Sequence, residues 1–207
     1  MSVIFENTEV WGIEHALRGM RNPMNSWNRI DSKINSEGLF EIGPNDLDLA
    51  KRLFKAGPEH RKYLRQIFVS VDISAPRYWW QEFDTYKIGT TANSCSTMHK
   101  LHYKKFEVED FEINEDDSEQ VKLLMSVICD NLNVLREHYL QTKSFEYIRQ
   151  MKKILPESYI QRRTITMNFE VLLNMVKQRK SHRLPEWKVD FMNWVNEVPY
   201  FTDIVEF

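Results

Sequence analysis

Several residue types that mark particular classes of protein are scarce in this sequence of 207 residues. Only two cysteines occur, Cys95 and Cys129, so the chain has no disulfide framework of the kind that stabilises small secreted domains. The glycines never fall into the spacing of dinucleotide-binding or triphosphate-binding loops, which disfavours the folds built on those loops. No apolar run approaches the ~18 to 20 residues that a membrane span needs. The sequence therefore predicts a soluble globular protein without a membrane partner.

Neither sign of charge is in large excess. Lys and Arg total 28 against 30 for Asp and Glu, which gives a net charge of -2. A general attraction to a nucleic acid polymer or to anionic lipid is therefore not expected, and any anionic ligand must be met by a local cluster of cations. The first seven residues lack the basic start and the apolar stretch of an export signal, so we expect a cytoplasmic protein.

The spacing of apolar residues predicts an α/β (α+β) fold in which helices flank a central mixed sheet. Segments 67–73 and 159–167 are rich in β-branched residues, which is typical of strands. Helical spacing is found over 9–20, 46–56, the segment after Pro76, 145–154, 169–179 and 185–198. The small polar residues of 89–97 indicate a loop. We expect residues 1–207 to form a single domain.

An acidic segment precedes the longest predicted helix. Eight acidic residues lie in 107–119, which is typical of a solvated connector. Apolar residues then recur every three or four positions from Val121 to Tyr139, which predicts an amphipathic helix with Asp117 as its N-cap. Together with the next helix it makes a long helical segment over 118–154.

Cys95, His99 and His102 are the first candidates for chemistry. Their spacing allows zinc ligation, but a second closely spaced pair of ligands is missing, so ordinary loop packing is favoured and no metal is expected. A thiolate beside an imidazole can also act as a nucleophile. A small buried thiol is the favoured interpretation, because free cysteine behaves mainly as a small hydrophobic residue.

Cations gather in the C-terminal half of the chain. They lie near the ends of two predicted helices and in the strand between them: Arg149, Lys152, Lys153, Arg162, Arg163, Lys177, Arg179 and Lys180. Converging Arg and Lys side chains can hold a phosphate without a glycine loop. Cations at helix C-termini also interact favourably with the helix dipole, and the sequence leaves both interpretations open.

Asn168 and Asn174 lie close to two helical turns apart, with Arg179 five positions further on. The apolar neighbours of Asn174 predict that it is buried, and a buried amide needs partners. An amide that points inward can read the edge of a base, because it donates and accepts hydrogen bonds at once. A polar residue on the exposed face of the helix is the alternative.

Residues 166–179 read T-M-N-F-E-V-L-L-N-M-V-K-Q-R, with Leu155-Pro156 before them and Glu186-Trp187 after them. This arrangement resembles the C-terminal half of the flavin-dependent thymidylate synthases (ThyX), where a strand runs into T-V-N-A-R-S-L-M-N-F-L-x-L-R and a Q-W-E stretch follows. The positions that match without a gap are Thr166, Asn168, Leu172, Asn174 and Arg179. Upstream, segment 56–60, the strand at 67–73 and Ala75-Pro76 are similar to the family's order of H-x-S-P-F-E-H, strand and proline.

The family signature R-H-R-x-x-S-x-N-E-x-S-x-R-Y is not intact. Segment 85–96 reads T-Y-K-I-G-T-T-A-N-S-C-S, so Thr85 and Tyr86 replace the Arg-His pair. The positions that still match are Lys87 and Thr90 and, after a shift of one residue, Asn93 and Ser96. An acid, Glu170, stands where the family has an arginine. The chain thus resembles a divergent member of the family.

The resemblance implies an enzyme that acts on a deoxyuridylate-type nucleotide, a small molecule, by flavin-dependent one-carbon transfer and reduction. It implies FAD, a folate one-carbon donor and a homotetramer with active sites at subunit interfaces. It assigns nucleotide contacts to Asn168, Asn174, Arg179 and Lys153, cofactor contacts to Lys87, Thr90, Asn93 and Ser96, and no catalytic residue. The altered signature and Glu170 favour an alternative, a non-catalytic protein that binds or sequesters a nucleotide on the same scaffold.

Overall fold

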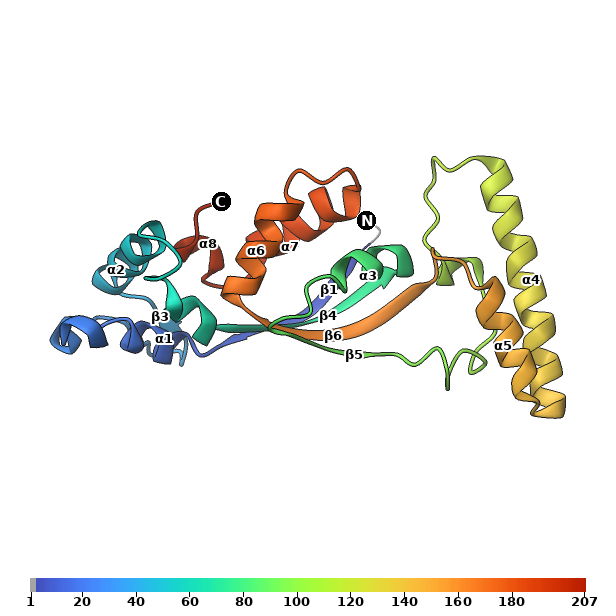
Figure 1. Cartoon of the computed structure of the whole chain (residues 1–207), viewed down its shortest axis with the longest axis horizontal. Coiled ribbons are helices and arrows are strands. Elements are labelled where there is room, and N and C mark those ends of the chain that lie inside the picture. The colour runs from blue at the N-terminus through green and yellow to red at the C-terminus, as the bar shows by residue number, and fades with distance from the viewer. Residues whose placement is uncertain (1–2) are drawn as a thin grey trace.

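The computed structural model describes residues 3–207 and shows an elongated molecule in which a pair of helices stands apart from the rest (Figure 1). Met1 and Ser2, the first residues of the segment examined for an export signal, lie outside the described residues. The strands are β1 (Ile4–Trp11), β2 (Lys33–Ile34), β3 (Phe40–Glu41), β4 (Phe68–Pro76), β5 (Thr90–Ser94) and β6 (Ile160–Asn168). The helices are α1 (Ile13–Gly19), α2 (Pro44–Lys55), α3 (Arg77–Phe83), α4 (Glu119–Thr142), α5 (Phe145–Ile154), α6 (Phe169–Arg179), α7 (Met192–Glu197) and α8 (Phe201–Ile204), with a π-helix at Glu186–Phe191.

Four strands form the central sheet in the order β1-β4-β6-β5. Each of the pairings between them is antiparallel, and Val71 of β4 lies opposite Ile165 of β6. The expected class, an α+β fold with helices packed on a central sheet and a long helical segment, is confirmed. The sheet is antiparallel in the described residues rather than mixed.

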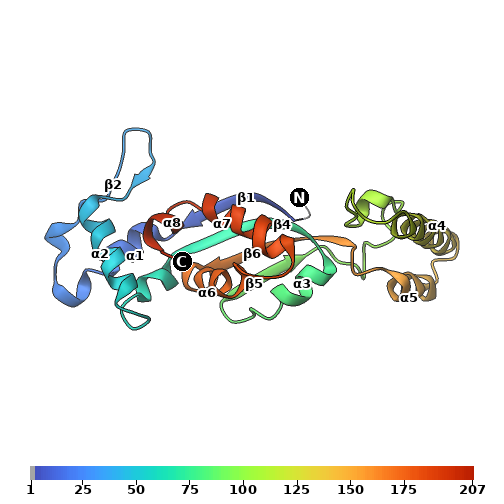
Figure 2. The same ribbon diagram turned by 90° about the horizontal axis from the view of Figure 1, so that it is seen from above.

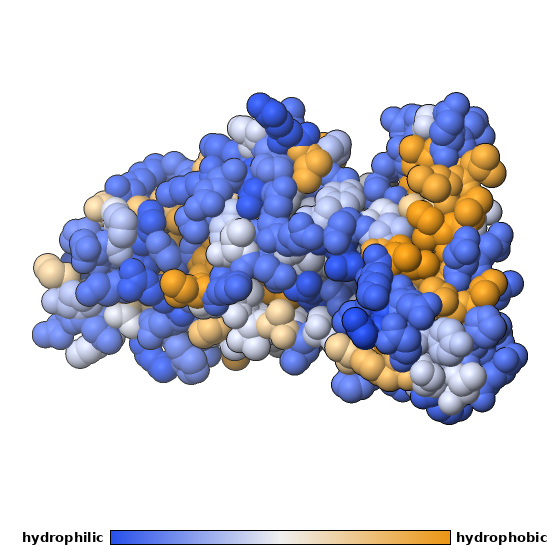
Figure 3. Space-filling model, turned by 45° about the vertical axis from the view of Figure 1, so that its right-hand side comes forward, coloured by the Kyte–Doolittle hydropathy of each residue, from blue (hydrophilic) through white to orange (hydrophobic). Residues whose placement is uncertain are grey.

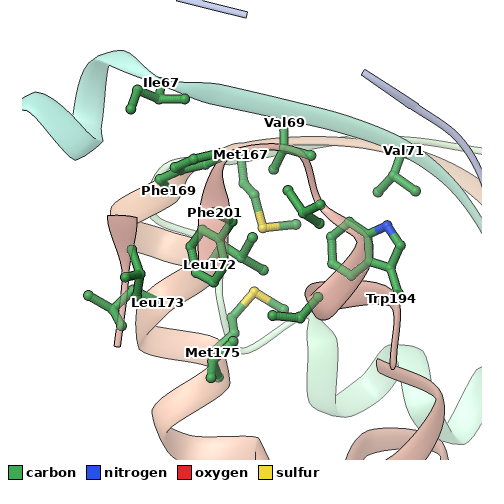
Figure 4. Packing of buried hydrophobic residues seen from close by; sticks show 14 of the residues in the cluster. Ile67, Val69, Val71, Met167, Phe169, Leu172, Leu173, Met175, Trp194 and Phe201 are labelled. Atoms are coloured by element: carbon green, nitrogen blue, oxygen red, sulfur yellow. The ribbon is translucent and has the colours of Figure 1, made fainter. Parts of the chain in front are cut away.

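One face of this sheet carries the main core. Side chains alternate along β4, so that Val69, Val71 and Ile73 are fully buried while Ser70 and Asp72 are half-buried on the other face. The buried side chains meet apolar residues of α6, α7 and α8, which cover this face (Figures 1 and 4). Burying one such large aliphatic side chain contributes roughly 1.5 to 3 kcal/mol, so this layer is a main source of stability.

Helices α4 and α5 form a projecting unit, here called the arm (residues 119–154), with an apolar cluster of its own (Figure 1). Leu132 of α4 and Ile148 and Met151 of α5 are buried in this cluster. The acidic segment before the arm is only partly solvated, because Phe111 is buried and bridges to Tyr159. The arm therefore packs around a second core, separate from that of the sheet.

The N-cap of α4 differs from the sequence prediction. The cap is Ser118, whose side chain accepts a hydrogen bond from the Val121 backbone N–H at 3.4 Å, and not Asp117. The Asp117 carboxylate instead accepts a hydrogen bond from the backbone N–H of Asn114 at 2.8 Å.

The sequence missed both edge strands of the sheet. The helix expected over 9–20 covers only 13–19, and the residues before it belong to β1. A bulge between Glu6 and Glu9, with Asn7 at φ 53°, interrupts the alternation that would mark this strand. Strand β5 falls in the expected loop at 89–97, and its residues are almost all exposed. Its ladder with β6, rather than its own composition, makes it a strand.

The other predicted elements agree with the structure within a few residues. These are the strands now labelled β4 and β6 and the helices α2, α3, α4, α5 and α6. The last predicted helix, 185–198, is present but begins as a π-helix. Within residues 3–207, no helix has both the length and the apolar character that crossing a bilayer requires.

Candidate functional site

Two clefts lie at opposite ends of β5, and each is lined by one of the eight residues assigned from the sequence, Asn174 or Ser96. The first, the α6 cleft, measures about 490 Å³ and is lined by residues that include Arg61, Tyr86, Glu170, Asn174 and Lys177. The second, the arm-root cleft, measures about 400 Å³ and is lined by residues that include Cys95, Ser96, Lys100, Tyr103, Tyr159 and Arg162. Strand β5 has five residues, so it spans about 17 Å between them.

Asn168 joins β6 to α6. Its side-chain oxygen accepts a hydrogen bond from the Val171 backbone N–H at 3.0 Å, which makes it the N-cap of α6. Gly89 approaches this turn so closely that a Cβ there would lie 2.9 Å from the Val171 side chain. Asn168 therefore holds the start of α6 against the loop that leads into β5.

Asn174 is exposed, so the prediction that it is buried was wrong. Its neighbours Leu173 and Met175 are buried, but successive residues of a helix point about 100° apart, and Asn174 faces the α6 cleft. Its side-chain oxygen accepts a hydrogen bond from Gln178 at 3.1 Å. The amide nitrogen of Asn174 has no hydrogen-bond partner in the described chain, so it can donate to a ligand in the cleft.

Arg179 is almost buried, with 13% of its side chain exposed, and it is fully engaged. Its guanidinium forms an ion pair with Glu82, donates to the Tyr86 hydroxyl at 2.8 Å and stacks 4.8 Å from the ring centre of Trp187. His182 lies 3.1 Å from the same Glu82 carboxylate. Arg179 thus fastens α6 to α3 and to the turn that follows it.

Glu170 also has an internal partner. Arg61 donates to both of its carboxylate oxygens, at 2.8 to 3.2 Å, and both side chains are less than a quarter exposed. The acid at the position where the family has an arginine is therefore neutralised by a cation from a distant part of the chain. The sequence reasoning did not include Arg61, and no local pattern pointed to it.

Like Asn168 and Arg179, four more of the assigned residues line neither cleft. Lys153 is exposed on α5 in the arm, while Arg179 lies in the body, so the structure does not bring these two together (Figure 1). Lys87 is exposed in the loop before β5. The Thr90 hydroxyl is buried and has no hydrogen-bond partner within residues 3–207. Asn93 is exposed on the edge strand β5, opposite Thr164.

The arm-root cleft brings hydroxyl groups and a free cation together. Ser96 begins a turn in which its Oγ accepts from the His99 backbone N–H at 3.1 Å and its carbonyl accepts from the Lys100 backbone N–H at 3.0 Å. The Lys100 ammonium lies 4.8 Å from the ring centre of Tyr103, and no carboxylate of the described chain lies within ion-pair distance of it. Tyr103 is 74% exposed, so its ring is open to a ligand.

The other charges of this cleft are paired. Lys104 forms an ion pair with Asp110, and Arg162 pairs with Glu6 at 2.8 Å and with Asp72 at 2.9 Å. Hydrogen bonds from Thr164, Asn7 and Arg162 lower the pKa of Asp72 to about 2. Burial raises the pKa of the Tyr159 phenol, so this residue is neutral at pH 7. The net charge left in the cleft comes from Lys100, which favours an anion.

The family resemblance assigned Ser96 to the cofactor, and the sequence did not point to Lys100 or Tyr103, which line the same cleft. Lys100 and Tyr103 follow Ser96 by four and seven positions, and this closeness in the sequence was the signal that could have identified them. Cys95 lines the same cleft with an exposed thiol, whereas a buried one was favoured. Within residues 3–207, no three His, Cys, Asp or Glu side chains come together in a way that could hold a metal ion.

No family model and no curated protein matches the sequence. Two of the solved structures that resemble the chain match it along its whole length. One is ThyX, the flavin-dependent thymidylate synthase of Helicobacter pylori, complexed with FAD and dUMP: it has a TM-score of 0.72 and 18% identity, and the match covers 99% of this chain and 98% of that one. The other is a structure of the same H. pylori protein with FAD and dUMP at 2.31 Å, with a TM-score of 0.72, 19% identity and full coverage of both chains. The chain therefore has a ThyX-like fold.

Proposed function

We propose that this chain, on its thymidylate synthase-like fold, binds a deoxyuridylate-type nucleotide whose phosphate lies in the arm-root cleft. The observation that carries this function is the free Lys100 ammonium beside the hydroxyls of Ser96 and Thr97 in a cleft of about 400 Å³. Hydroxyl and ammonium donors suit a phosphate, and the exposed ring of Tyr103 can stack on a base. The nucleotide in the H. pylori structures, dUMP, has a phosphate for these donors and a base for this ring.

The site proposed here needs a second copy of the chain. Asn174 and Arg179 lie at the other end of β5 from Lys100, about 17 Å of strand away, which is longer than a nucleoside monophosphate. One molecule of nucleotide can therefore use both sets of residues only if they come from different copies. This favours the homo-oligomer, a tetramer, that the family resemblance implies.

An exposed apolar face on α4 supports such an assembly (Figure 3). Its residues are 44 to 68% exposed, which is more than a monomer in water usually leaves in one contiguous stripe: Val121, Leu123, Leu124, Val127 and Val134. We place the assembled protein in the cytoplasm, since both cysteines are free.

The residues of this chain fit a flavin less well than a nucleotide. Of the segment that meets the flavin in the family, Thr85 donates its hydroxyl to the Glu82 carbonyl at 2.8 Å, and the Tyr86 hydroxyl is shared between Gln178 and Arg179. Segment 85–96 offers a diphosphate a single cation, Lys87, and the unpartnered hydroxyl of Thr90 is buried. For this reason nucleotide binding comes first and flavin chemistry second.

Calorimetry with dUMP tests the nucleotide site. We expect saturable binding by the wild type and binding about tenfold weaker in Lys100→Ala, because a charged hydrogen bond contributes about 1.5 to 3 kcal/mol and this one is partly solvated. Lys62→Ala is the matched control, since Lys62 is exposed and lies outside both clefts. Equal affinity of the Lys100 variant and the control would remove the arm-root cleft from the site.

Mixing two weakened variants tests the shared site. Lys100→Ala and Arg179→Ala each weaken one half of it, so a mixed oligomer regains some intact sites at which the two wild-type halves meet. We expect sites of wild-type dUMP affinity to reappear after the variants are unfolded and refolded together, and not when either is refolded alone. No recovery in mixed oligomers would mean that each copy binds by itself.

Flavin-dependent one-carbon transfer is the second candidate, because both similar structures contain FAD as well as dUMP. Purified protein that stays yellow after desalting, and that converts dUMP to thymidylate with a folate one-carbon donor, would establish the enzyme. Colourless protein that binds dUMP would establish the non-catalytic alternative.

A further inference from the structure

A cleft lies at the end of the molecule opposite the arm, between α1 and the hairpin of β2 and β3 (Figures 1 and 2). It consists of two adjoining hollows of about 330 Å³ and about 230 Å³, which share Glu14, Ile34 and Phe40 in their walls. We call the two together the hairpin cleft. None of the residues assigned to the nucleotide or the cofactor lines it.

A buried polar network fixes the hairpin that forms its outer wall. Asp46 is fully buried and accepts hydrogen bonds from Arg21 at 2.6 Å and from the Ser32 hydroxyl and backbone N–H at 2.6 and 3.0 Å. Asp31 in turn accepts from the Asn45 and Asp46 backbone N–H groups at the start of α2. The wall is therefore held in place without a ligand.

The turn of the hairpin is ordered as well. The Asn35 side chain accepts from the backbone N–H groups of Glu37 and Leu39, at 3.0 and 2.9 Å, and donates to the Glu41 carboxylate at 2.9 Å. A hairpin projecting this far (Figure 2) keeps its shape through these bonds rather than through an apolar core.

Apolar side chains nevertheless line the hollow side of the wall. Ile30 is 40% exposed and Ile34 is 64% exposed, and both face the larger hollow together with Leu17 and Phe40. Exposed apolar groups gathered around a concave surface are typical of a ligand site. A volume of about 330 Å³ lies at the small end of the range for such sites.

The charges around the hollow select the sign of the ligand. Glu14 lies 4.0 Å from Arg18, and Asp46 is paired with Arg21, so these charges cancel in pairs. Lys33 is exposed and has no ion-pair partner in the described chain. Glu41 lies opposite Lys33 in the hairpin ladder, but it forms no ion pair with Lys33, accepts a hydrogen bond from Asn35 and lies outside the walls of both hollows. Lys33 is therefore the cation in the lining of the hollow that is left without an ion pair, and it is complementary to an anion with an apolar body.

We propose that the hairpin cleft binds a small apolar carboxylate, with its hydrocarbon body between Leu17, Ile34 and Phe40 and its carboxylate at Lys33. An aromatic or branched body of about ten carbon atoms fills the larger hollow. Because this cleft is separate from both proposed nucleotide clefts, its ligand is independent of the nucleotide.

Methyl NMR with 2-naphthoate tests this site. We expect saturable shifts of the Ile30 and Ile34 methyl signals, and about tenfold weaker binding of the uncharged isostere 2-naphthamide, which lacks the charged group for Lys33. Lys33→Glu lowers the 2-naphthoate affinity about tenfold, and Ile34→Ser about fivefold, while Lys62→Glu leaves it unchanged. Lys33 and Ile34 are exposed, so these substitutions leave the fold intact.

Three outcomes would overturn the proposal. They are equal affinities for 2-naphthoate and 2-naphthamide, equal affinities of Lys33→Glu and Lys62→Glu, and shifts that are as large at Val127 and Val134 on α4 as at Ile30 and Ile34. The last would mean general attraction of an apolar probe to exposed apolar groups.

Discussion

The α6 cleft and the arm-root cleft differ in whether the cations in and beside them form ion pairs. In and beside the α6 cleft, Arg61 forms an ion pair with Glu170 and Arg179 with Glu82, and both arginine side chains are 13% exposed. In the arm-root cleft Lys100 has only an aromatic ring beside it, while its neighbours are paired. Arg179, a position that matches the family, is thus held in an internal ion pair, whereas Lys100, which lies outside that resemblance, has no ion pair. A nucleotide at Arg179 must therefore compete with Glu82, and a nucleotide at Lys100 meets no such competitor.

We expect the largest effect from restoring the family's arginine at position 170 in the α6 cleft. Glu170→Arg places two arginines against each other where little solvent reaches, so we expect a loss of about 2 to 3 kcal/mol in the free energy of unfolding, measured by urea denaturation. The double variant Glu170→Arg/Arg61→Glu reverses the pair and should recover most of the loss. A stable single variant would show that the pair contributes nothing to the fold.

Removing Arg179 tests whether a nucleotide can bind this residue in place of its ion-pair partner Glu82. Arg179→Ala should weaken dUMP binding by ~1.5 to 3 kcal/mol in calorimetry, the value of a charged hydrogen bond. Glu82→Gln keeps the shape but weakens the hold on Arg179, so it should leave dUMP binding at least as tight as in the wild type. Unchanged affinity in Arg179→Ala would give this residue a purely structural role.

Removing Lys100, the free cation of the arm-root cleft, should affect stability much less than removing an ion-paired residue of the α6 cleft. Lys100→Ala should leave the free energy of unfolding within about 0.5 kcal/mol of the wild type, because Lys100 is exposed and lacks an ion pair. The same variant should lose dUMP affinity, as described above. A clear loss of stability instead of affinity would contradict the distinction between the two clefts.

Low pH should reduce the stability of the folded chain through Asp72, which pairs with Arg162 of the arm-root cleft. The pKa of this carboxyl is about 2 in the folded chain and ~3.9 in an unfolded one, so its contribution to stability is present above pH ~4 and is lost as the pH falls toward 2. Asp72→Asn should flatten the stability curve over this window, measured by urea denaturation between pH 2 and 5. A curve that keeps the wild-type slope would show that other carboxyl groups control it.

The sequence was a good guide where one side of an element is buried. Strands β4 and β6 and helix α6 each bury a regular set of apolar residues, so their periodicity was visible. The edge strands β1 and β5 bury little, and only their ladders with β4 and β6 define them. The burial of Asn174 was predicted wrongly for a related reason. Its apolar neighbours lie on either side of a helix face that stays exposed to solvent.

The sequence by itself determined the order of β4, α3, α4, α5, β6 and α6 and the resemblance to ThyX, because these follow from residue spacing along the chain. Only the tertiary structure decided which charges are free. The partners Arg61 and Glu170 lie 109 positions apart, and Arg179 and Glu82 lie 97 apart. Whether a cation meets a carboxylate or stays open to a ligand depends on folding contacts of that range, and spacing along the chain carries no record of them.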